Sequence, residues 1–216
     1  MKTVKLWTRN FRLVILASAI GTLGAIAGGF ALAFLVFDET GSTLASALIV
    51  AIQLLPYLLL PVLVAPFMDR LPRKSFLVAG DAANAILLAG MGMWLLFFDF
   101  SYVGYLAVSL LLACLGAADE LAFTSIYPEL IPEGAEQKGY AVSSMLYPVL
   151  KVIMTPLAAV LLDTLGVAWI LIAQSGLSLA AAVTESFIRL DETERKHRAP
   201  YSLRAWIDDI REAVQY

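Results

Sequence analysis

The chain has 216 residues, of which 60% are hydrophobic and only 15% are charged, and its mean hydropathy is +0.81. This composition excludes an ordinary soluble domain, because water cannot be the main solvent of so apolar a chain. The formal net charge of −3 leaves no basic surplus, so we expect no binding of nucleic acid.

Two rare residue types narrow the chemistry further. Cys114 is the only cysteine, which excludes an intrachain disulfide and a cysteine-based zinc site. His197 is the only histidine and lies in the charged run DETERKHR, where a solvated position is expected. The sequence also offers no paired nucleophile and base and no glycine-rich phosphate loop. We therefore expect no enzymatic activity, no cofactor and no metal.

Six apolar segments follow one another along the chain, and each is long enough for the roughly 20 helical residues that cross a bilayer. None of them alternates in polarity as the strands of a membrane barrel do. The sequence predicts an all-α membrane protein with one six-span bundle over residues 1–189. The predicted spans lie near 11–36, 43–66, 76–98, 102–126, 139–162 and 168–189.

The first span carries no charge from Leu13 to Phe37, which makes it too long for the apolar core of a signal peptide. Within it, Gly21, Ala25 and Gly29 recur at every fourth position. Small residues at this spacing let helices approach closely. We therefore expect this face of the first span to pack against another helix.

Lysine and arginine are unevenly distributed between the loops. They precede or open the first span and follow the second, fourth and sixth, whereas the loops DETGST, FDFSY and DTLG carry only acidic charge. Basic residues in short loops stay on the cytoplasmic side of a membrane. We therefore expect a multi-pass protein of the plasma or inner membrane with both termini in the cytoplasm.

The second and third spans are joined by MDRLPRKS, residues 68–75, which contains four charges in eight residues. A basic turn fixes topology, but an aspartate contributes little to it. We therefore expect a charge cluster that pairs with a facing helix end or carboxylate, and Asp81 in the third span is the candidate partner. The residues assigned to this cluster are Asp69, Arg70, Arg73, Lys74 and Asp81.

Charges inside the fourth and fifth spans are the strongest candidates for a site, because a charge within the bilayer is unfavourable and is a functional hypothesis by default. Lys151 lies about 12 residues, or ~18 Å, from the cytoplasmic start of its helix, near the midplane. Asp119 and Glu120 lie at a shallower level, within reach of the lysine. Two interpretations stay open: a buried ion pair that locks two helices, and a lysine that contacts substrate.

A polar face accompanies Lys151 along the fifth span, as in helices that line a cavity. Polar residues in the second, third and sixth spans are weaker signals, because they form interhelical hydrogen bonds more often than ligand contacts. Of these we retain Gln53 and Tyr57, and rank Gln174, Asn84 and Glu185 below them. The candidate substrate cavity therefore comprises Gln53, Tyr57, Asp119, Glu120, Ser144, Tyr147, Lys151 and Thr155.

Residues 190–216 are predicted to form a cytoplasmic linker with an amphipathic helix. The apolar residues of YSLRAWIDDIREAVQY fall on one face at helical spacing. Two interpretations stay open here as well. The helix either lies in the lipid interface or docks against a second half of the protein.

The stretch APFMDRLPRKS resembles the loop signature G-x-L-x-D-R-x-G-R-[RK] of the major facilitator superfamily. Its four charged residues fall on the charged positions of the signature. LVAGDAANA, YPELIPEG and TPLAAVL are similar to the efflux-type branch, which includes macrolide and siderophore exporters. The resemblance implies one six-helix repeat of a transporter that normally has twelve spans. It also implies a second six-helix half as partner, either a homodimer or a separate C-terminal half.

Two classes of function remain. The first is a transporter, or the N-terminal half of one, that moves a small amphipathic or anionic molecule by alternating access, with efflux the expected direction. The second is a six-helix assembly partner or truncated remnant that transports nothing alone. Lys151 and its polar face favour transport, because a non-transporting bundle has little reason to keep a midplane cation. The expected partners are the lipid bilayer, a small-molecule substrate and a second six-helix half.

Overall fold

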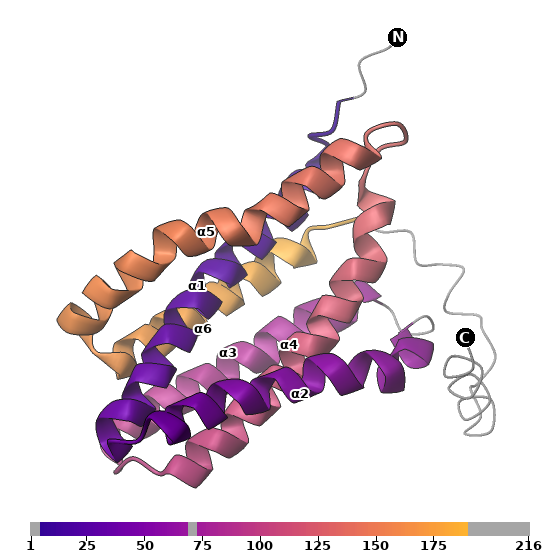
Figure 1. Cartoon of the computed structure of the whole chain (residues 1–216). Coiled ribbons are helices and arrows are strands. Elements are labelled where there is room, and N and C mark those ends of the chain that lie inside the picture. The colour runs from indigo at the N-terminus through magenta and orange to yellow at the C-terminus, as the bar shows by residue number, and fades with distance from the viewer. Residues whose placement is uncertain (1–4, 69–72, 190–216) are drawn as a thin grey trace.

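The structure is a computed structural model that describes residues 5–68 and 73–189. In those ranges it contains helices and no strand, and all six helices are long and apolar enough to cross a membrane (Figure 1). The prediction of an all-α, six-span protein is confirmed. The helices are α1 (Arg9–Thr40), α2 (Thr43–Met68), α3 (Arg73–Phe97), α4 (Tyr102–Leu130), α5 (Glu136–Leu165) and α6 (Val167–Ser186). The predicted tail helix, like Asp69 and Arg70, lies outside the described residues.

The ends of α1 show why several helices run beyond the predicted spans. The Thr8 hydroxyl accepts a hydrogen bond from the Phe11 amide at 3.2 Å and caps the start of α1. Gly41 ends the helix with a φ of +63°, and its N–H bonds to the Phe37 carbonyl. Helical hydrogen bonding therefore continues through the polar residues 38–40, which hydropathy alone leaves outside the span.

The sixth helix packs against both α1 and α3, and glycines allow these approaches. On α1, the side chain of Gln174 lies directly against Gly28. On α3, a Cβ atom placed at Gly92 would lie 2.7 Å from Ile172 Cγ1 and 2.9 Å from the Ala168 carbonyl oxygen, both on α6. Backbones this close increase the contact area between helices. In lipid, helix association depends on such packing, because there is no hydrophobic driving force between the helices.

The predicted packing face of Gly21, Ala25 and Gly29 is wrong. A Cβ atom at Gly21 or Gly29 would meet nothing within 4 Å, and all three residues line a cavity instead. The close contacts of α1 lie on the neighbouring face, at Gly24 and Gly28. Both faces carry small residues at every fourth position, so spacing alone cannot tell which of them packs against α6.

Polar side chains inside the bundle bond to backbone carbonyls of neighbouring helices. The Tyr105 hydroxyl of α4 donates to the Met91 carbonyl of α3 at 3.0 Å. The Ser175 hydroxyl of α6 donates to the Ala85 carbonyl of the same helix α3 at 2.7 Å. Because the bilayer core holds no water to replace such bonds, they satisfy groups that would otherwise be unfavourable to bury.

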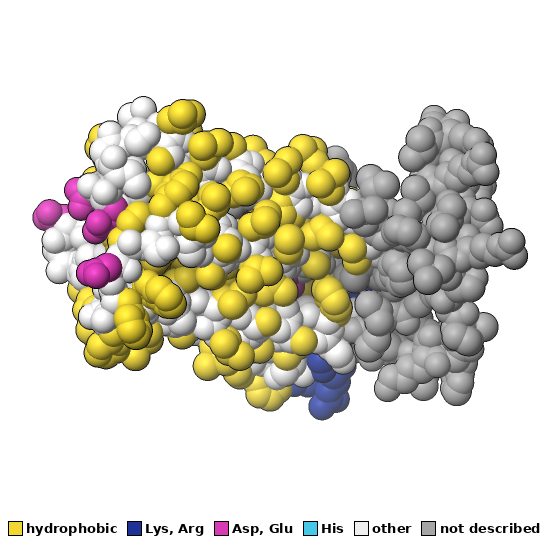
Figure 2. Space-filling view, turned by 90° about the horizontal axis from the view of Figure 1, so that it is seen from below, with side chains coloured by type: hydrophobic (Ala, Val, Ile, Leu, Met, Phe, Trp, Pro, Cys, Tyr) yellow, Lys and Arg dark blue, Asp and Glu magenta, His cyan; other side chains and the backbone are white. Residues whose placement is uncertain are grey.

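The surface of the bundle is divided by charge. Figure 2 shows hydrophobic side chains over the middle of the molecule, Asp and Glu side chains at one end, and Lys and Arg side chains towards the other. On α2 and α5, large apolar side chains such as Leu58 and Val152 are 70% and 76% exposed. Such surfaces are stable against lipid or against another protein, not against water.

Gly92→Ala should destabilise the bundle, because the new methyl group would overlap Ile172 and the α6 backbone. Overpacking of this kind destabilises by about 1–3 kcal/mol. Gly90→Ala is the matched control on the same helix, since its Cβ would meet nothing within 4 Å and alanine favours a helix. Thermal unfolding of the purified chain in detergent measures both. Equal midpoints for the two variants would contradict the close approach of α3 and α6.

Candidate functional site

A cavity of about 530 Å³ lies among the helices, and all six contribute side chains to its wall. Its volume is that of an ordinary small-molecule site. The wall combines apolar side chains with polar and acidic ones, and none of the described residues that line it is Lys, Arg or His. The polar lining residues are Ser18, Thr22, Gln53, Tyr57, Asp81, Asn84, Ser109, Asp119, Glu120, Ser143, Tyr147, Gln174, Ser178 and Glu185.

The structure brings together part of the predicted cavity. The predicted residues that line it are Gln53, Tyr57, Asp119, Glu120 and Tyr147. The predicted residues outside its wall are Ser144, Lys151 and Thr155, which are exposed on α5. The hydroxyls of Ser144 and Thr155 donate to carbonyls one turn earlier in the same helix. These hydroxyls therefore have hydrogen-bond partners without a ligand or another helix.

Lys151 lies beside an aromatic ring and not beside a carboxylate. Its ammonium nitrogen is 5.4 Å from the centroid of the Tyr147 ring, within the range of a cation–π contact. In the described part of the chain it forms no ion pair with Asp119 or Glu120. The interhelical lock, one of the two interpretations left open by the sequence, is therefore not formed in this structure. Contact with substrate stays a prediction.

Three helices place carboxylates in the cavity wall: Asp81 on α3, Asp119 on α4 and Glu185 on α6. Asp119 interacts electrostatically with Asp81, and Glu185 interacts with both. Asp119 Oδ1 and Glu185 Oε2 are buried and have no hydrogen-bond partner. Like charges held close together in a poorly solvated site repel one another, so ionisation of all three carboxylates is unfavourable without a compensating positive charge.

Small residues on the neighbouring helices make room for the cluster and for Tyr57. A Cβ atom at Gly80 would lie 3.5 Å from Asp119 Oδ1, so α4 can bring its carboxylate close to the α3 backbone. A Cβ atom at Gly116 would lie only 2.6 Å from the Tyr57 hydroxyl oxygen. Glycine at this position therefore lets the phenol reach the wall of α4.

Glu185 is the functional candidate that sequence reasoning ranked too low. In the structure it is only 5% exposed. In the sequence it is a single acid four residues before the end of the last predicted span, a position typical of a residue at the membrane interface. The sequence feature that points to the site is the depth of this acid within its span. Asp81 lies five residues into the third predicted span, 76–98, and Glu185 lies four residues before the end of the sixth, 168–189. Two acids at similar depth on different helices predict one shared site.

Two neutral groups in the wall are also without partners. The Ser109 side chain is 1% exposed, and its hydroxyl has no hydrogen-bond partner. The side-chain oxygen of Gln174, held against Gly28, likewise has none. Buried polar groups are normally satisfied, so unsatisfied groups that line a cavity indicate a place for an occupant.

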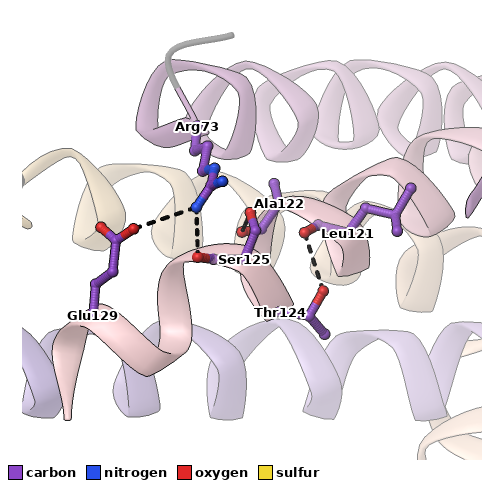
Figure 3. Close-up of polar contacts among 6 residues, drawn as sticks. All are labelled: Arg73, Leu121, Ala122, Thr124, Ser125 and Glu129. Carbon is purple, nitrogen blue, oxygen red and sulfur yellow. Dashed lines mark hydrogen bonds and ion pairs between the residues drawn. The ribbon is translucent and has the colours of Figure 1, made fainter. Parts of the chain in front are cut away.

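Arg73 joins the start of α3 to the end of α4, as Figure 3 shows. Its Nη1 atom donates to the Ser125 carbonyl at 2.7 Å and to the Glu129 carboxylate at 3.4 Å. Pro128 lies in this turn of α4 and has no N–H, so the Thr124 carbonyl four residues earlier has no helical donor, and the Arg73 bond is made to the adjacent Ser125 carbonyl. Lys74 follows Arg73 in α3, while Asp81, the expected partner of this cluster, lines the cavity instead.

Comparison with known proteins gives one match. A family model described as Major Facilitator Superfamily matches residues 13–212, which include nearly all of the six helices. No curated protein and no solved structure gives a significant match to the chain.

Arg73→Ala should lower the thermal unfolding midpoint, because the Ser125 carbonyl loses a charged donor near the end of α4. Hydrogen bonds to charged groups contribute roughly 1.5–3 kcal/mol. Arg12→Ala is the control, since it removes the same charge from an exposed position near the start of α1. If both variants unfold at the same temperature, Arg73 does not hold α3 to α4.

Proposed function

The chain belongs to the major facilitator superfamily, and we propose that it is a membrane transporter, or the N-terminal half of one, that moves a small amphipathic molecule by alternating access. The observation that carries this proposal is a cavity among six apolar helices whose wall contains polar and acidic side chains. Burying polar and charged groups without partners is unfavourable. A cavity that retains them therefore favours a substrate pathway over a bundle that only fills the membrane.

One side of the cavity wall supports the proposal of a second six-helix unit. Tyr57 on α2 and Tyr147 on α5 line the cavity and are nevertheless 46% and 53% exposed. Glu120 on α4 is also an exposed lining residue. Lipid cannot satisfy these polar groups. We assign this face to a second copy of the chain or to a separate C-terminal half, which would complete the cavity.

Arg73, Ser125 and Glu129, here called the Arg73 cluster, form a contact that can differ between conformers. It ties one end of α3 to one end of α4 through a charged donor, a carbonyl and a partly exposed carboxylate. A few such bonds are weak enough to break and re-form in a conformational cycle. We place this end in the cytoplasm of a plasma or inner membrane on the basis of the lysine and arginine distribution, with efflux as the direction.

A solvent-filled pathway can be tested with single cysteines in a chain that carries Cys114→Ala. Ser143→Cys lies in the cavity wall, seven residues into α5. Leu179→Cys is the matched control, because it also lies seven residues from the corresponding end of its helix, α6, but is 54% exposed outside the cavity. A charged thiol reagent should label Ser143→Cys in inside-out vesicles and leave Leu179→Cys unlabelled, because lipid excludes the charged reagent.

Transport itself is measured in cells that express the chain, with a panel of cationic, zwitterionic and anionic amphipathic dyes. Lower accumulation of any of these dyes than in vector cells supports efflux, and higher accumulation supports uptake. No difference for any dye, together with equal labelling of the two cysteines, would contradict transport. That outcome would favour the alternative of a non-transporting assembly partner or a truncated remnant.

A further inference from the structure

We propose that the cavity binds an organic cation, with the positively charged group of the ligand among Asp81, Asp119 and Glu185. The inference rests on the proposed transport function and names its substrate class. It selects a cationic amphipathic substrate over the anionic molecule that the sequence also left open.

The first support is the sign of the charge in the wall. Asp81, Asp119, Glu120 and Glu185 all line the cavity, and no described Lys, Arg or His lines it with them. The carboxylates of Asp81, Asp119 and Glu185 are close enough to interact with one another. A bound cation would replace this mutual repulsion by attraction, and low solvation of the site would strengthen that attraction.

The second support is a set of buried hydrogen-bond acceptors that have no partner. This observation is separate from the count of acidic residues in the wall. Glu185 is 5% exposed, and its Oε2 atom has no hydrogen-bond partner. The Gln174 side-chain oxygen is also unpartnered in the same cavity. The unpartnered Ser109 hydroxyl lies ten residues, or ~15 Å, along α4 from Asp119, so it faces the other end of the cavity. Carboxylate and amide oxygens accept hydrogen bonds, so the complementary ligand carries N–H donors or a diffuse positive charge.

The spacing of the acids favours an organic cation over a metal ion. Among the described residues, no group of three Asp, Glu, His or Cys side chains is close enough to hold a metal ion. The described carboxylates therefore do not converge on one point as the ligands of a bound metal ion do. A substituted ammonium, guanidinium or phosphonium group has the size to contact acids from three helices at once.

The remainder of the cavity has the character of a site for an apolar body. Leu88 and Met91 line it on α3, seven and ten residues beyond Asp81. At 1.5 Å per residue, Met91 lies ~15 Å along the helix from the acid. Leu171 lines the same region from α6, and these three residues belong to one apolar cluster. The site is acidic at one end and apolar at the other, which is complementary to an amphipathic cation.

The matched probes for this proposal are tetraphenylphosphonium and tetraphenylborate, which have nearly the same shape and opposite charge. The full chain in lipid nanodiscs should bind tetraphenylphosphonium saturably, above the partitioning measured with empty nanodiscs. Asp119→Asn and Glu185→Gln should each raise the Kd for tetraphenylphosphonium by about tenfold or more, the effect of losing one charge–charge attraction in a poorly solvated site. Asp99→Asn is the control, because it removes an equal charge from an exposed position outside the cavity.

Three results would overturn the proposal: no saturable binding of tetraphenylphosphonium to the parent chain, unchanged binding in both cavity variants, and equal saturable binding of tetraphenylborate. The thermal midpoint of each variant shows whether it is folded, and Asp119→Glu provides a second test, since it keeps the charge and should keep the affinity within a few fold. Transport of neutral or anionic dyes in the cell assay would leave the proposed function standing while the cation site fails.

Discussion

The structure depends on how closely α6 approaches its two neighbours. Gly28 on α1 accepts the side chain of Gln174, and Gly92 on α3 lies against the α6 backbone at Ala168. In lipid, this packing and the hydrogen bonds to helix carbonyls stabilise the bundle in place of hydrophobic burial from water. The same packing places Glu185 of α6 beside Asp81 of α3 and Asp119 of α4. Assembly of the bundle and assembly of the acidic cavity are therefore one event.

The Arg73 cluster and the cavity are connected through two helices. Arg73 and Asp81 lie eight residues apart on α3, and Asp119 and Ser125 lie six residues apart on α4. The bond from Arg73 to the Ser125 carbonyl is one of the contacts that hold α3 against α4 at the end of the bundle nearer to the two carboxylates. If that bond breaks in the transport cycle, the acids of α3 and α4 are free to separate. Such a connection would couple the state of the Arg73–Ser125 bond to the affinity of the cavity for its ligand.

The sequence predicts the fold well and the site only in part, for physical reasons. Span length and apolarity are local properties, so all six helices follow from them. Which side chains meet is a property of helix rotation, which hydropathy does not determine. Lys151 lies near the middle of its span, yet α5 turns it out of the cavity wall beside Tyr147. Glu185 has a less conspicuous position in the sequence, yet α6 turns it inwards among the other acids.

The central claim is that the carboxylates of the cavity are kept for an occupant and not for the stability of the bundle. The most direct measurement is the thermal unfolding midpoint of Asp119→Asn and Glu185→Gln in lipid nanodiscs without ligand. Each variant replaces a buried, unpartnered carboxylate by a neutral amide of the same shape. The account predicts midpoints equal to or above that of the parent chain. Midpoints several degrees lower would show that the acids stabilise the fold, and would contradict it.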